Sequence, residues 1–258
     1  MAIHPTAVVD ASVSIPESCT VGPFCTVGAG VEMGEHCELL SHVVLNGPTK
    51  LGDYNRIFPF AVVGMGPQDL TYKGEPTRLE VGDHNDIREY VTIHRGTIKG
   101  GGLTKIGSHC LIMAYAHIAH DCMVGDHVIM PNASTLAGHV TIEDWVQLAA
   151  LAPVHQFVRV GAHSYIGGGT TITQDVMPFS KTSAARDVHA YGANSVGLER
   201  RGFSKERIGA IQKAFRVLLA AKLNTTQALE RIEAEVEQTD DVKQLVEFIR
   251  TSERGVVK

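Results

Sequence analysis

The sequence lacks the features of membrane-spanning proteins and of secreted proteins. No apolar run in its 258 residues approaches the roughly 18 residues that a membrane-spanning helix needs. Residues 1–5 contain neither a basic stretch nor an apolar segment, so we expect no signal peptide and a cytoplasmic location. The formal net charge of −5 argues against a general nucleic-acid binder.

Positive charge is scarce except in one segment. Residues 199–222 contain seven Lys or Arg and two Glu, in a chain with 23 basic and 28 acidic residues. A basic cluster on a mildly acidic protein indicates one acidic partner or a phosphate-bearing ligand. The alternative is a solvated helix face that binds nothing.

An aliphatic residue recurs at every sixth position over most of the chain. The recurrence forms three runs: Ile3, Val9, Ile15, Val21, Val27, Met33, Leu39, Leu45, Leu51, Ile57 and Val63; Val81, Ile87 and Ile93; and Ile106, Ile112, Ile118, Val124, Met130, Leu136, Ile142, Leu148, Val154, Val160, Ile166 and Ile172. A mostly small residue stands four positions after each aliphatic, as at Ala7 or Ala116. A period of six fits neither an α-helix nor a coiled coil, and it is typical of a hexapeptide β-helix.

The repeat predicts an all-β left-handed parallel β-helix over residues 1–190, the left hand being that of hexapeptide proteins as a class. Each hexad forms a strand and a corner, and three hexads form a triangular coil. The 26 aliphatic positions predict roughly nine coils and, at about 4.8 Å per strand, a prism roughly 40 Å long. The phase resets predict loop insertions near 64–78 and 95–104, and such loops are typical of functional segments.

Two other residue types follow the same period. Glycine often comes directly after the aliphatic, as at Gly22, Gly52 and Gly125, where we expect a tight corner with φ > 0. All five cysteines fall on the small-residue register: Cys19, Cys25, Cys37, Cys110 and Cys122. Cysteine counting could suggest a metal site or disulfides, but the register indicates small, buried core residues.

The last segment, 191–258, is predicted to be a C-terminal helical domain. Ser204–Leu223 has a helical apolar face. Asn224 and Gln227 resemble a capping box before a second helix through about Glu237, and Asp240 or Asp241 begins a third. These helices would cap the end of the solenoid and cover its last strand edges.

Histidines gather near one edge of successive coils. His117 and His120 flank the inward Ile118, and His139 lies about one coil later, nearly stacked over His120. His155 follows after a further coil. A zinc site would need three ligands converging on one ion. General acid–base catalysis by His120, oriented by Asp121, is the second interpretation. The third is a set of exposed corner histidines with no role.

Several long motifs resemble one family, the acyl-[acyl carrier protein]–UDP-N-acetylglucosamine O-acyltransferases, the first enzymes of lipid A synthesis. The resemblance spans essentially the whole chain, including the tail. The motifs are Gln68-Asp69-Leu70, Gly74-Glu75-Pro76-Thr77-Arg78, Thr92-Ile93-His94-Arg95-Gly96-Thr97, Ala116-His117-Ile118-Ala119-His120-Asp121, Leu136-Ala137-Gly138-His139-Val140, Val154-His155-Gln156-Phe157 and Arg200-Arg201-Gly202-Phe203.

The resemblance implies a role for each matching residue. His120 would be the general base that deprotonates the sugar 3-hydroxyl, Asp121 would orient it, and the Gly138 N–H would stabilise the oxyanion. Contacts with the UDP-N-acetylglucosamine or acyl substrate would come from Gln68, Asp69, His117, His139, Gln156, Asn194 and Arg200. Gly168 matches the family's acyl-chain ruler and implies a comparatively long chain. The acyl carrier protein would dock on Arg201, Lys205, Arg207, Lys213 and Arg216.

The resemblance also implies a homotrimer with sites between neighbouring prisms, and no metal or cofactor. The sequence departs from the family at two positions: relatives often carry lysine where this chain has Thr71, and some carry glutamate in place of Val196. Lys73 follows Thr71 by two residues.

Three other possibilities remain open. The N-acyltransferase that acts later in the same pathway has an extra N-terminal domain, whereas the hexads here begin at Ile3. A first-step enzyme that acylates a 3-amino UDP-sugar fits the same motifs. The third is a hexapeptide protein of another kind, either a zinc-dependent hydratase or an inert solenoid.

Overall fold

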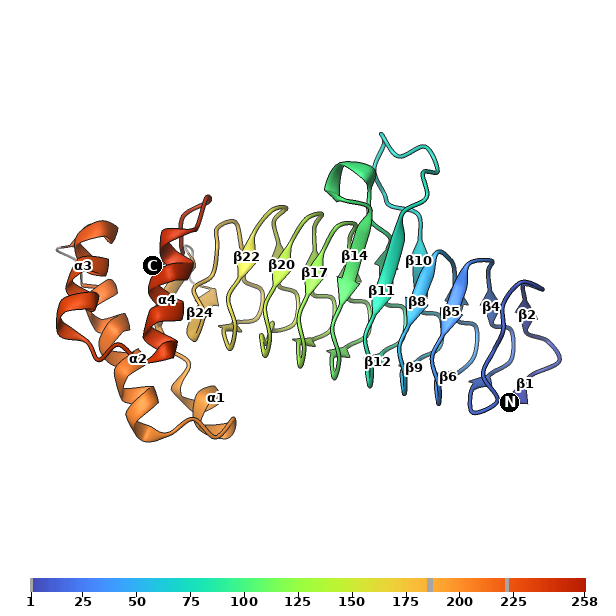
Figure 1. Cartoon of the computed structure of the whole chain (residues 1–258), viewed down its shortest axis with the longest axis horizontal. Helices are drawn as coiled ribbons and strands as arrows, with labels where there is room; N and C mark the ends of the chain where they lie inside the picture. Colours follow the sequence, from blue (N-terminus) through green and yellow to red (C-terminus); the bar gives the residue numbers. More distant parts are fainter. Residues whose placement is uncertain (1, 185–187, 221–222) are drawn as a thin grey trace.

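The computed structural model describes residues 2–184, 188–220 and 223–258, and most of the chain forms a left-handed parallel β-helix, as predicted (Figure 1). The first sheet contains β1 (Ala2–Ile3), β3 (Thr20–Val21), β6 (Glu38–Leu39), β9 (Arg56–Ile57), β12 (Asp86–Ile87), β15 (Leu111–Ile112) and β18 (Ile129–Met130). The second contains β2 (Val8–Val9), β4 (Thr26–Val27), β7 (Val44–Leu45), β10 (Val62–Met65), β13 (Thr92–His94), β16 (His117–Ile118), β19 (Thr135–Leu136) and β21 (Pro153–Val154). The third contains β5 (Val31–Met33), β8 (Thr49–Leu51), β11 (Arg78–Val81), β14 (Leu103–Ile106), β17 (Met123–Val124), β20 (Thr141–Ile142) and β22 (Arg159–Val160).

Every coil runs from the first sheet to the second, then to the third and back. We call the turn from first to second sheet the first corner, the turn from second to third the second corner, and the turn back to the first sheet the third corner. Pairing within each sheet is parallel and joins equivalent hexads of successive coils, as between Ile93 and Ile118.

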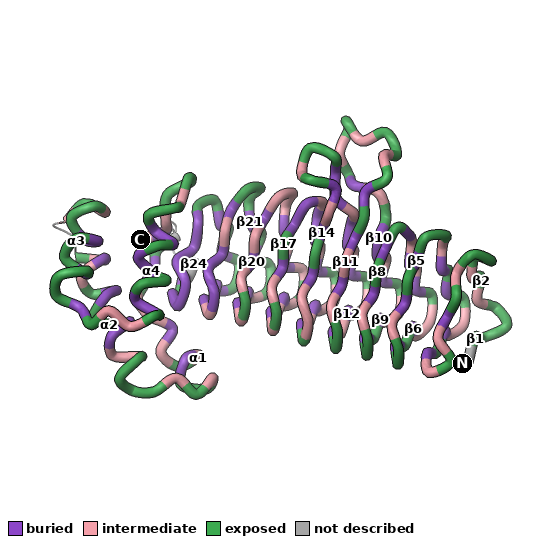
Figure 2. The backbone as a smooth tube through the Cα atoms, viewed as in Figure 1, coloured by how far each residue is buried: buried purple, intermediate pink, exposed green. Residues whose placement is uncertain are grey.

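The aliphatic register forms one continuous core. From Val21 to Ile172 each of these side chains is at most 8% exposed, and only at the open N-terminal end does the exposure rise, to 37% at Ile3. Burying one such side chain contributes about 1.5–3 kcal/mol. The five cysteines are free and at most 2% exposed, so their predicted role as small core residues is confirmed. Figure 2 shows the buried positions along the strands and the exposed corners.

Gly22, Gly52 and Gly125 do not have positive φ, so that prediction was wrong for them, although Gly64, which follows Val63 at the start of the first insertion, has φ 82°. Positive φ occurs two residues further along, where His84 has φ 55° and Tyr90 has φ 59°. The glycine is needed because its α-carbon lies against the next coil: a Cβ on Gly22 would overlap the carbonyl of Leu40. Close approach of backbones therefore explains this glycine.

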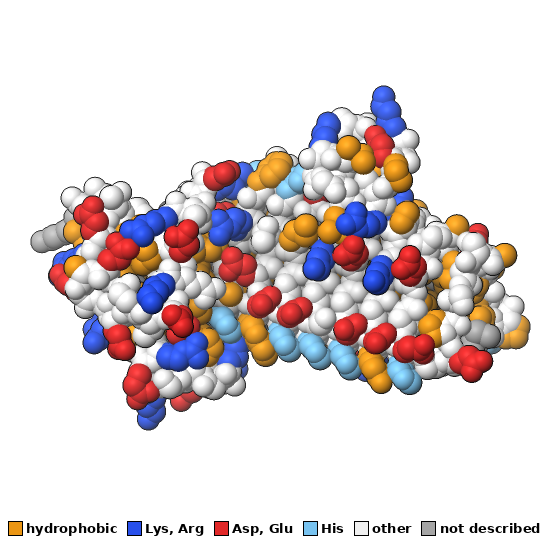
Figure 3. Space-filling view, viewed as in Figure 1, with side chains coloured by type: hydrophobic (Ala, Val, Ile, Leu, Met, Phe, Trp, Pro, Cys, Tyr) orange, Lys and Arg blue, Asp and Glu red, His pale blue; other side chains and the backbone are white. Residues whose placement is uncertain are grey.

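The positive-φ residues stack in columns along the corners. At the third corner His36, Tyr54, His84, His109, His127, Trp145, His163 and Phe179 follow one another with ring centroids 3.9–6.2 Å apart. Figure 3 shows this column along the lower edge of the prism. These histidines have a packing role, away from the second corner.

Both loop insertions leave the prism at the second corner. One connects β10 to β11 and the other connects β13 to β14, close to the predicted ranges 64–78 and 95–104. The second insertion contains a short 3₁₀ helix, η1 (Ile98–Gly100). The two loops project side by side from the upper edge in Figure 1, over the neighbouring coils.

Among the described residues, the solenoid ends in a short sheet and four helices. β23 (Tyr165–Ile166) pairs in parallel with β24 (Ser180–Ala184), which pairs in antiparallel fashion with β25 (Val188–Ala193). The helices are α1 (Ser195–Arg200), α2 (Lys205–Leu218), α3 (Thr225–Glu235) and α4 (Asp240–Arg250). Met177, Phe179 and Ala190 already belong to the core of the helices, so the tail packs onto the end of the prism.

The predicted tail helices are present with shifted ends. The first ends at Leu218 rather than 223, and residues 221 and 222 of that prediction lie outside the described residues. The capping box of Asn224 and Gln227 is confirmed, and it begins the second helix at Thr225. Sequence reasoning missed α1. Among the described residues, no helix is both long and apolar enough to span a membrane.

Candidate active site

The second corner brings the predicted catalytic residues together. His120 and Asp121 follow β16, and the imidazole rings of His120 and His139 lie edge to face with centroids 5.2 Å apart. His139 does not stack directly over His120. The 18-residue register places Gly138 over His120 and His139 over Asp121, and the ring of His139 stacks on Phe157 at 4.5 Å.

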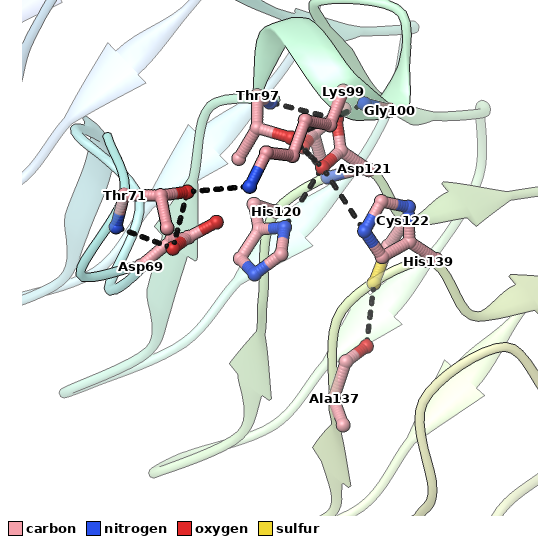
Figure 4. Close-up of polar contacts among 11 residues, drawn as sticks. Asp69, Thr71, Thr97, Lys99, Gly100, His120, Asp121, Cys122, Ala137 and His139 are labelled. Carbon is pink, nitrogen blue, oxygen red and sulfur yellow. Dashed lines mark hydrogen bonds and ion pairs between the residues drawn. The ribbon is translucent and has the colours of Figure 1, made fainter. Parts of the chain in front are cut away.

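Asp121 is the buried centre of this cluster. Its side chain is 1% exposed, and its Oδ2 lies 2.8 Å from His120 Nδ1 and 3.6 Å from His139 Nε2. The second insertion supplies two further donors: Thr97 donates its N–H to Oδ1 and its hydroxyl to Oδ2, each at 2.7 Å. Figure 4 shows Thr97 and Gly100 of this loop above the carboxylate. A carboxylate with this many donors is held in one position.

The contacts of Asp121 fix the protonation pattern of His120. An ionised carboxylate accepts hydrogen bonds only, so the hydrogen of neutral His120 lies on Nδ1. Nε2 then carries the lone pair. The His120 side chain is 17% exposed, and Figure 4 shows its second nitrogen directed away from Asp121. Such an imidazole is a base whose protonated form is stabilised by the adjacent carboxylate.

Gly138 makes room for this ring. A Cβ at position 138 would lie 2.6 Å from His120 Cε1 and 2.9 Å from Nε2, inside van der Waals contact. The N–H groups on either side of Gly138 are bonded, Ala137 to Val154 and His139 to His120. Among the described residues, none accepts a hydrogen bond from the Gly138 N–H. This donor is therefore free to bind an oxygen beside His120.

Two histidines line the floor of the site. His117 Nδ1 lies 2.7 Å from the Thr92 hydroxyl, and burial, with a smaller effect of His120, lowers the His117 pKa. His94, only 5% exposed, packs edge-on against His117. Burial lowers the pKa of His94 to about 4, with smaller effects of His117 and His120. His94 is therefore neutral at pH 7.

Asp69 reaches the site from the first insertion. Its Oδ1 accepts hydrogen bonds from the N–H of Thr71 at 2.7 Å and from the Thr71 hydroxyl at 2.9 Å. These bonds lower the pKa of Asp69, and the charges of Lys99 and His120 add smaller effects. Gln68 is exposed beside it. Gln156 is exposed at the same corner, one coil beyond Gly138. Six predicted residues thus share the corner of His120: Gln68, Asp69, Asp121, Gly138, His139 and Gln156.

Three predicted residues lie elsewhere on the chain. Asn194 and Arg200 line a cavity over the first sheet, together with Gln147, Tyr165, Lys181 and Val196. Asn194 caps α1 by accepting from Gly197 N–H at 3.3 Å and donates to the His163 carbonyl at 3.2 Å. Gly168 is exposed at the first corner. The first sheet faces away from the second corner, so one chain does not bring these residues to His120.

The basic residues of the tail fall into two groups. Arg201 donates to the Trp145 carbonyl at 2.6 Å and lies over the Trp145 ring, and Arg207 forms two 2.8 Å bonds with Asp241. The first contact joins the tail to the prism, and the second joins α2 to α4. Lys205, Lys213 and Arg216 are exposed on α2.

Sequence reasoning missed three residues of the site. Thr97 and His94 stand inside a quoted motif but had no assigned role, and Thr104 accepts from the Asp121 N–H at 2.8 Å. The signals for Thr97 were its place in that motif and in an insertion predicted to be functional. The donor atoms of His120, Asp121 and His139 lie within 4.8 Å of one another, a set that could also bind a metal ion.

Known proteins resemble this chain along its whole length. Residues 103–138 match the family model for bacterial transferase hexapeptide repeats, and residues 175–257 match the model for UDP N-acetylglucosamine O-acyltransferase, domain 2. A relative from Anaeromyxobacter sp. (strain Fw109-5), named acyl-[acyl-carrier-protein]–UDP-N-acetylglucosamine O-acyltransferase, is 46% identical over 258 residues, 100% of each chain. One of the same name from Halorhodospira halophila is 45% identical over 256 residues, 99% of each.

Solved structures agree with this comparison. The UDP-N-acetylglucosamine acyltransferase of Francisella novicida superimposes with a TM-score of 0.95 at 39% identity, over 99% of this chain and 93% of that one. The UDP-N-acetylglucosamine O-acyltransferase of Moraxella catarrhalis gives a TM-score of 0.95 at 41% identity, over 100% of both chains.

Proposed function

Because the chain belongs to the acyl-[acyl-carrier-protein]–UDP-N-acetylglucosamine O-acyltransferase family, it transfers an acyl group from acyl carrier protein to UDP-N-acetylglucosamine in the first step of lipid A synthesis, and we propose that His120 is the base of this transfer. The observation that supports this role is the His120 ring, bonded to buried Asp121 on one side and open on the other.

The reaction follows from these positions. His120 Nε2 removes the proton of the sugar 3-hydroxyl, and the oxygen attacks the carbonyl carbon of the acyl thioester. Asp121 stabilises the imidazolium that forms. The Gly138 N–H donates to the oxyanion of the tetrahedral intermediate. The intermediate then releases the carrier thiolate, which takes the proton from His120, and the acyl group remains on the sugar oxygen.

The test is the variant His120→Ala. We expect kcat for transfer to fall by about 10² to 10⁴, the usual contribution of a general base, while the fold persists. His36→Ala, which removes the terminal ring of the third-corner column, is the matched control and keeps its activity. Near-normal turnover in a folded His120→Ala protein would reject His120 as the base.

We also propose that each site forms between two neighbouring prisms of a trimer, in the cytoplasm. Asn194, Arg200 and Gly168 lie on the first sheet and first corner of their own chain, whereas His120 lies at the second corner. A neighbour that presents its first-sheet side to this corner would complete the site.

A metal-dependent activity is the second candidate, because His120, Asp121 and His139 could hold one ion. In that case His120 would have to turn away from its 2.8 Å contact with Asp121 or share it with the ion. Metal analysis of active protein separates the two: loss of stoichiometric zinc together with activity would overturn the general-base assignment. Assays with UDP-N-acetylglucosamine and with its 3-amino analogue decide which acceptor group reacts.

A further inference from the structure

Lys99 extends from η1 toward the first insertion. Its Nζ donates a 3.1 Å hydrogen bond to the Thr71 hydroxyl, and Thr71 in turn donates to Asp69. Figure 4 shows Lys99, Thr71 and Asp69 in this chain of contacts beside the ring of His120. An ammonium thus stands next to the carboxylate of Asp69, beside His120.

Hydrogen bonds within the second insertion and to Asp121 fix the backbone around Lys99. Thr97 caps η1 and also binds Asp121 through two hydrogen bonds, so the start of the turn is fixed to the catalytic carboxylate. Gly100, on the other side of Lys99, packs directly on the carboxylate of Asp121. The backbone of Lys99 therefore keeps a constant position relative to His120, although its side chain is exposed.

Thr71 is the link between Lys99 and Asp69. A threonine there supplies no positive charge, and Lys73 is not a substitute: it is exposed, and its N–H is bonded to Glu75. Lys99 brings an ammonium to within hydrogen-bond distance of Thr71 from the opposite loop. The short threonine side chain leaves space for this ammonium and binds it through its hydroxyl.

We propose that Lys99 is a substrate-binding residue of this enzyme, which supplies from the second insertion the positive charge that position 71 lacks. An ammonium has three N–H donors and Thr71 occupies one, so the others can bind an oxygen of the UDP-N-acetylglucosamine acceptor. Sugar hydroxyls and the diphosphate are both oxygen ligands for such a donor, and the charge on the diphosphate makes the bond stronger and dependent on salt. This inference rests on the proposed function of the same site.

The competing explanation is mechanical: Lys99 merely ties the two insertions together. Arg95 already does this, since its guanidinium bonds to the Gly47 carbonyl and to the Tyr72 hydroxyl at 3.3 Å. Loss of the Lys99 contact should therefore leave the loops in place and remove the charge.

The experiment measures UDP-N-acetylglucosamine binding by calorimetry in the His120→Ala background, and kinetics in the otherwise native enzyme. Lys99→Met should raise Kd and KM for the nucleotide sugar about tenfold or more, as expected for a hydrogen bond from a charged donor, and leave KM for the acyl carrier protein unchanged. Lys73→Met, a lysine of the first insertion, is the control and should change neither.

The decisive variant restores the charge at the other position. Thr71→Lys combined with Lys99→Met should recover most of the sugar affinity, which a tie between loops cannot do because no contact joins the new side chains. Sugar binding changed less than twofold by Lys99→Met, or equal increases in KM for both substrates, would overturn the proposal. Recovery that weakens when salt is added indicates that Lys99 binds the diphosphate. Recovery that salt does not weaken indicates that it binds a sugar hydroxyl. If native protein bound no nucleotide sugar, the proposed function itself would have failed.

Discussion

At the scale of single residues, the catalytic pair is completed by a side chain that is far away in the sequence. His120 and Asp121 are neighbours, but the hydrogen bonds that immobilise Asp121 come from Thr97, 24 residues earlier. The Thr97 hydroxyl and His120 Nδ1 both bind Oδ2. Thr97 is therefore a positioning residue, since it acts on the substrate only through Asp121 and His120.

Thr97→Val should lower kcat about tenfold with little change in KM for either substrate. The variant keeps the backbone N–H bond to Oδ1 but frees Asp121 Oδ2 to move, and loss of one hydrogen bond to a charged group is worth about 1.5–3 kcal/mol. The pH profile of kcat should shift, because the carboxylate next to His120 changes its hydrogen bonding. Thr97→Ser restores the hydroxyl and should restore the profile. A change in KM alone would contradict a positioning role.

His94 makes the fold sensitive to acid. Its pKa is about 4 in the folded protein, mainly because of burial, against 6.5 without it. Since the pKa is lower when folded, protonation below pH 6.5 favours the unfolded protein. The free energy of unfolding that is present above pH 6.5 therefore decreases by about 3 kcal/mol as the pH falls toward 4. The free energy of unfolding of His94→Leu, measured with urea, should decrease less over this pH range than that of native protein. His4→Gln, at an exposed position, should leave the slope unchanged, and equal slopes for His94→Leu and native protein would refute the prediction.

Gly168 tests the predicted acyl-chain ruler without disturbing the fold. A Cβ there would meet only the Ala150 carbonyl oxygen at 3.7 Å and Ala149 Cβ at 4.0 Å, so its own chain has space for a side chain. Gly168→Met should shift the preferred acyl donor to a shorter chain, measured as kcat/KM over a ladder of acyl lengths. An unchanged preference would exclude Gly168 as the ruler.

At the scale of elements, the parts that repeat were the predictable ones. Ile87, Ile112 and Met130 occupy the same inward position in successive coils, so the period alone gave the strands and the core. The sequence also located both insertions, since each interrupts the period. It did not reveal that Thr97 and Lys99 reach across the corner to Asp121 and Thr71, because those contacts depend on loop shape and have no period. The short helix α1 was missed because six residues carry too weak a pattern.

The element α2 carries the next prediction, the docking surface for acyl carrier protein. Arg201 and Arg207 are engaged within the chain, which leaves Lys205, Lys213 and Arg216 exposed for an acidic partner. Lys213→Glu with Arg216→Glu should raise KM for the carrier protein about tenfold at low salt, and the effect should shrink as salt screens the charges. KM for the nucleotide sugar should not change. Lys50→Glu, on the exposed side of the third sheet, is the control. An equal effect on KM for the carrier protein from the third sheet and from α2 would indicate that net charge, and not a docking surface, is responsible.

At the scale of the whole molecule, the prism separates two groups of residues that one reaction needs. His120 stands at the second corner, and the cavity of Asn194 and Arg200 opens over the first sheet. If neighbouring chains share each site, a chain lacking the base and a chain lacking the nucleotide contact can complement one another. His120→Ala and Arg200→Ala proteins, each impaired alone, should regain activity when unfolded and refolded together.

The size of that recovery follows from the symmetry. In a ring assembled at random from equal amounts, a site works when one chain supplies His120 and its neighbour supplies Arg200, which gives about a quarter of native activity per site. A chain that carries both substitutions, mixed with Arg200→Ala, can form no complete site and serves as the control. Sedimentation confirms that the mixtures have the same mass as native protein. If the mixture is as inactive as its components, His120 and Arg200 act within one chain, and the shared site must be abandoned.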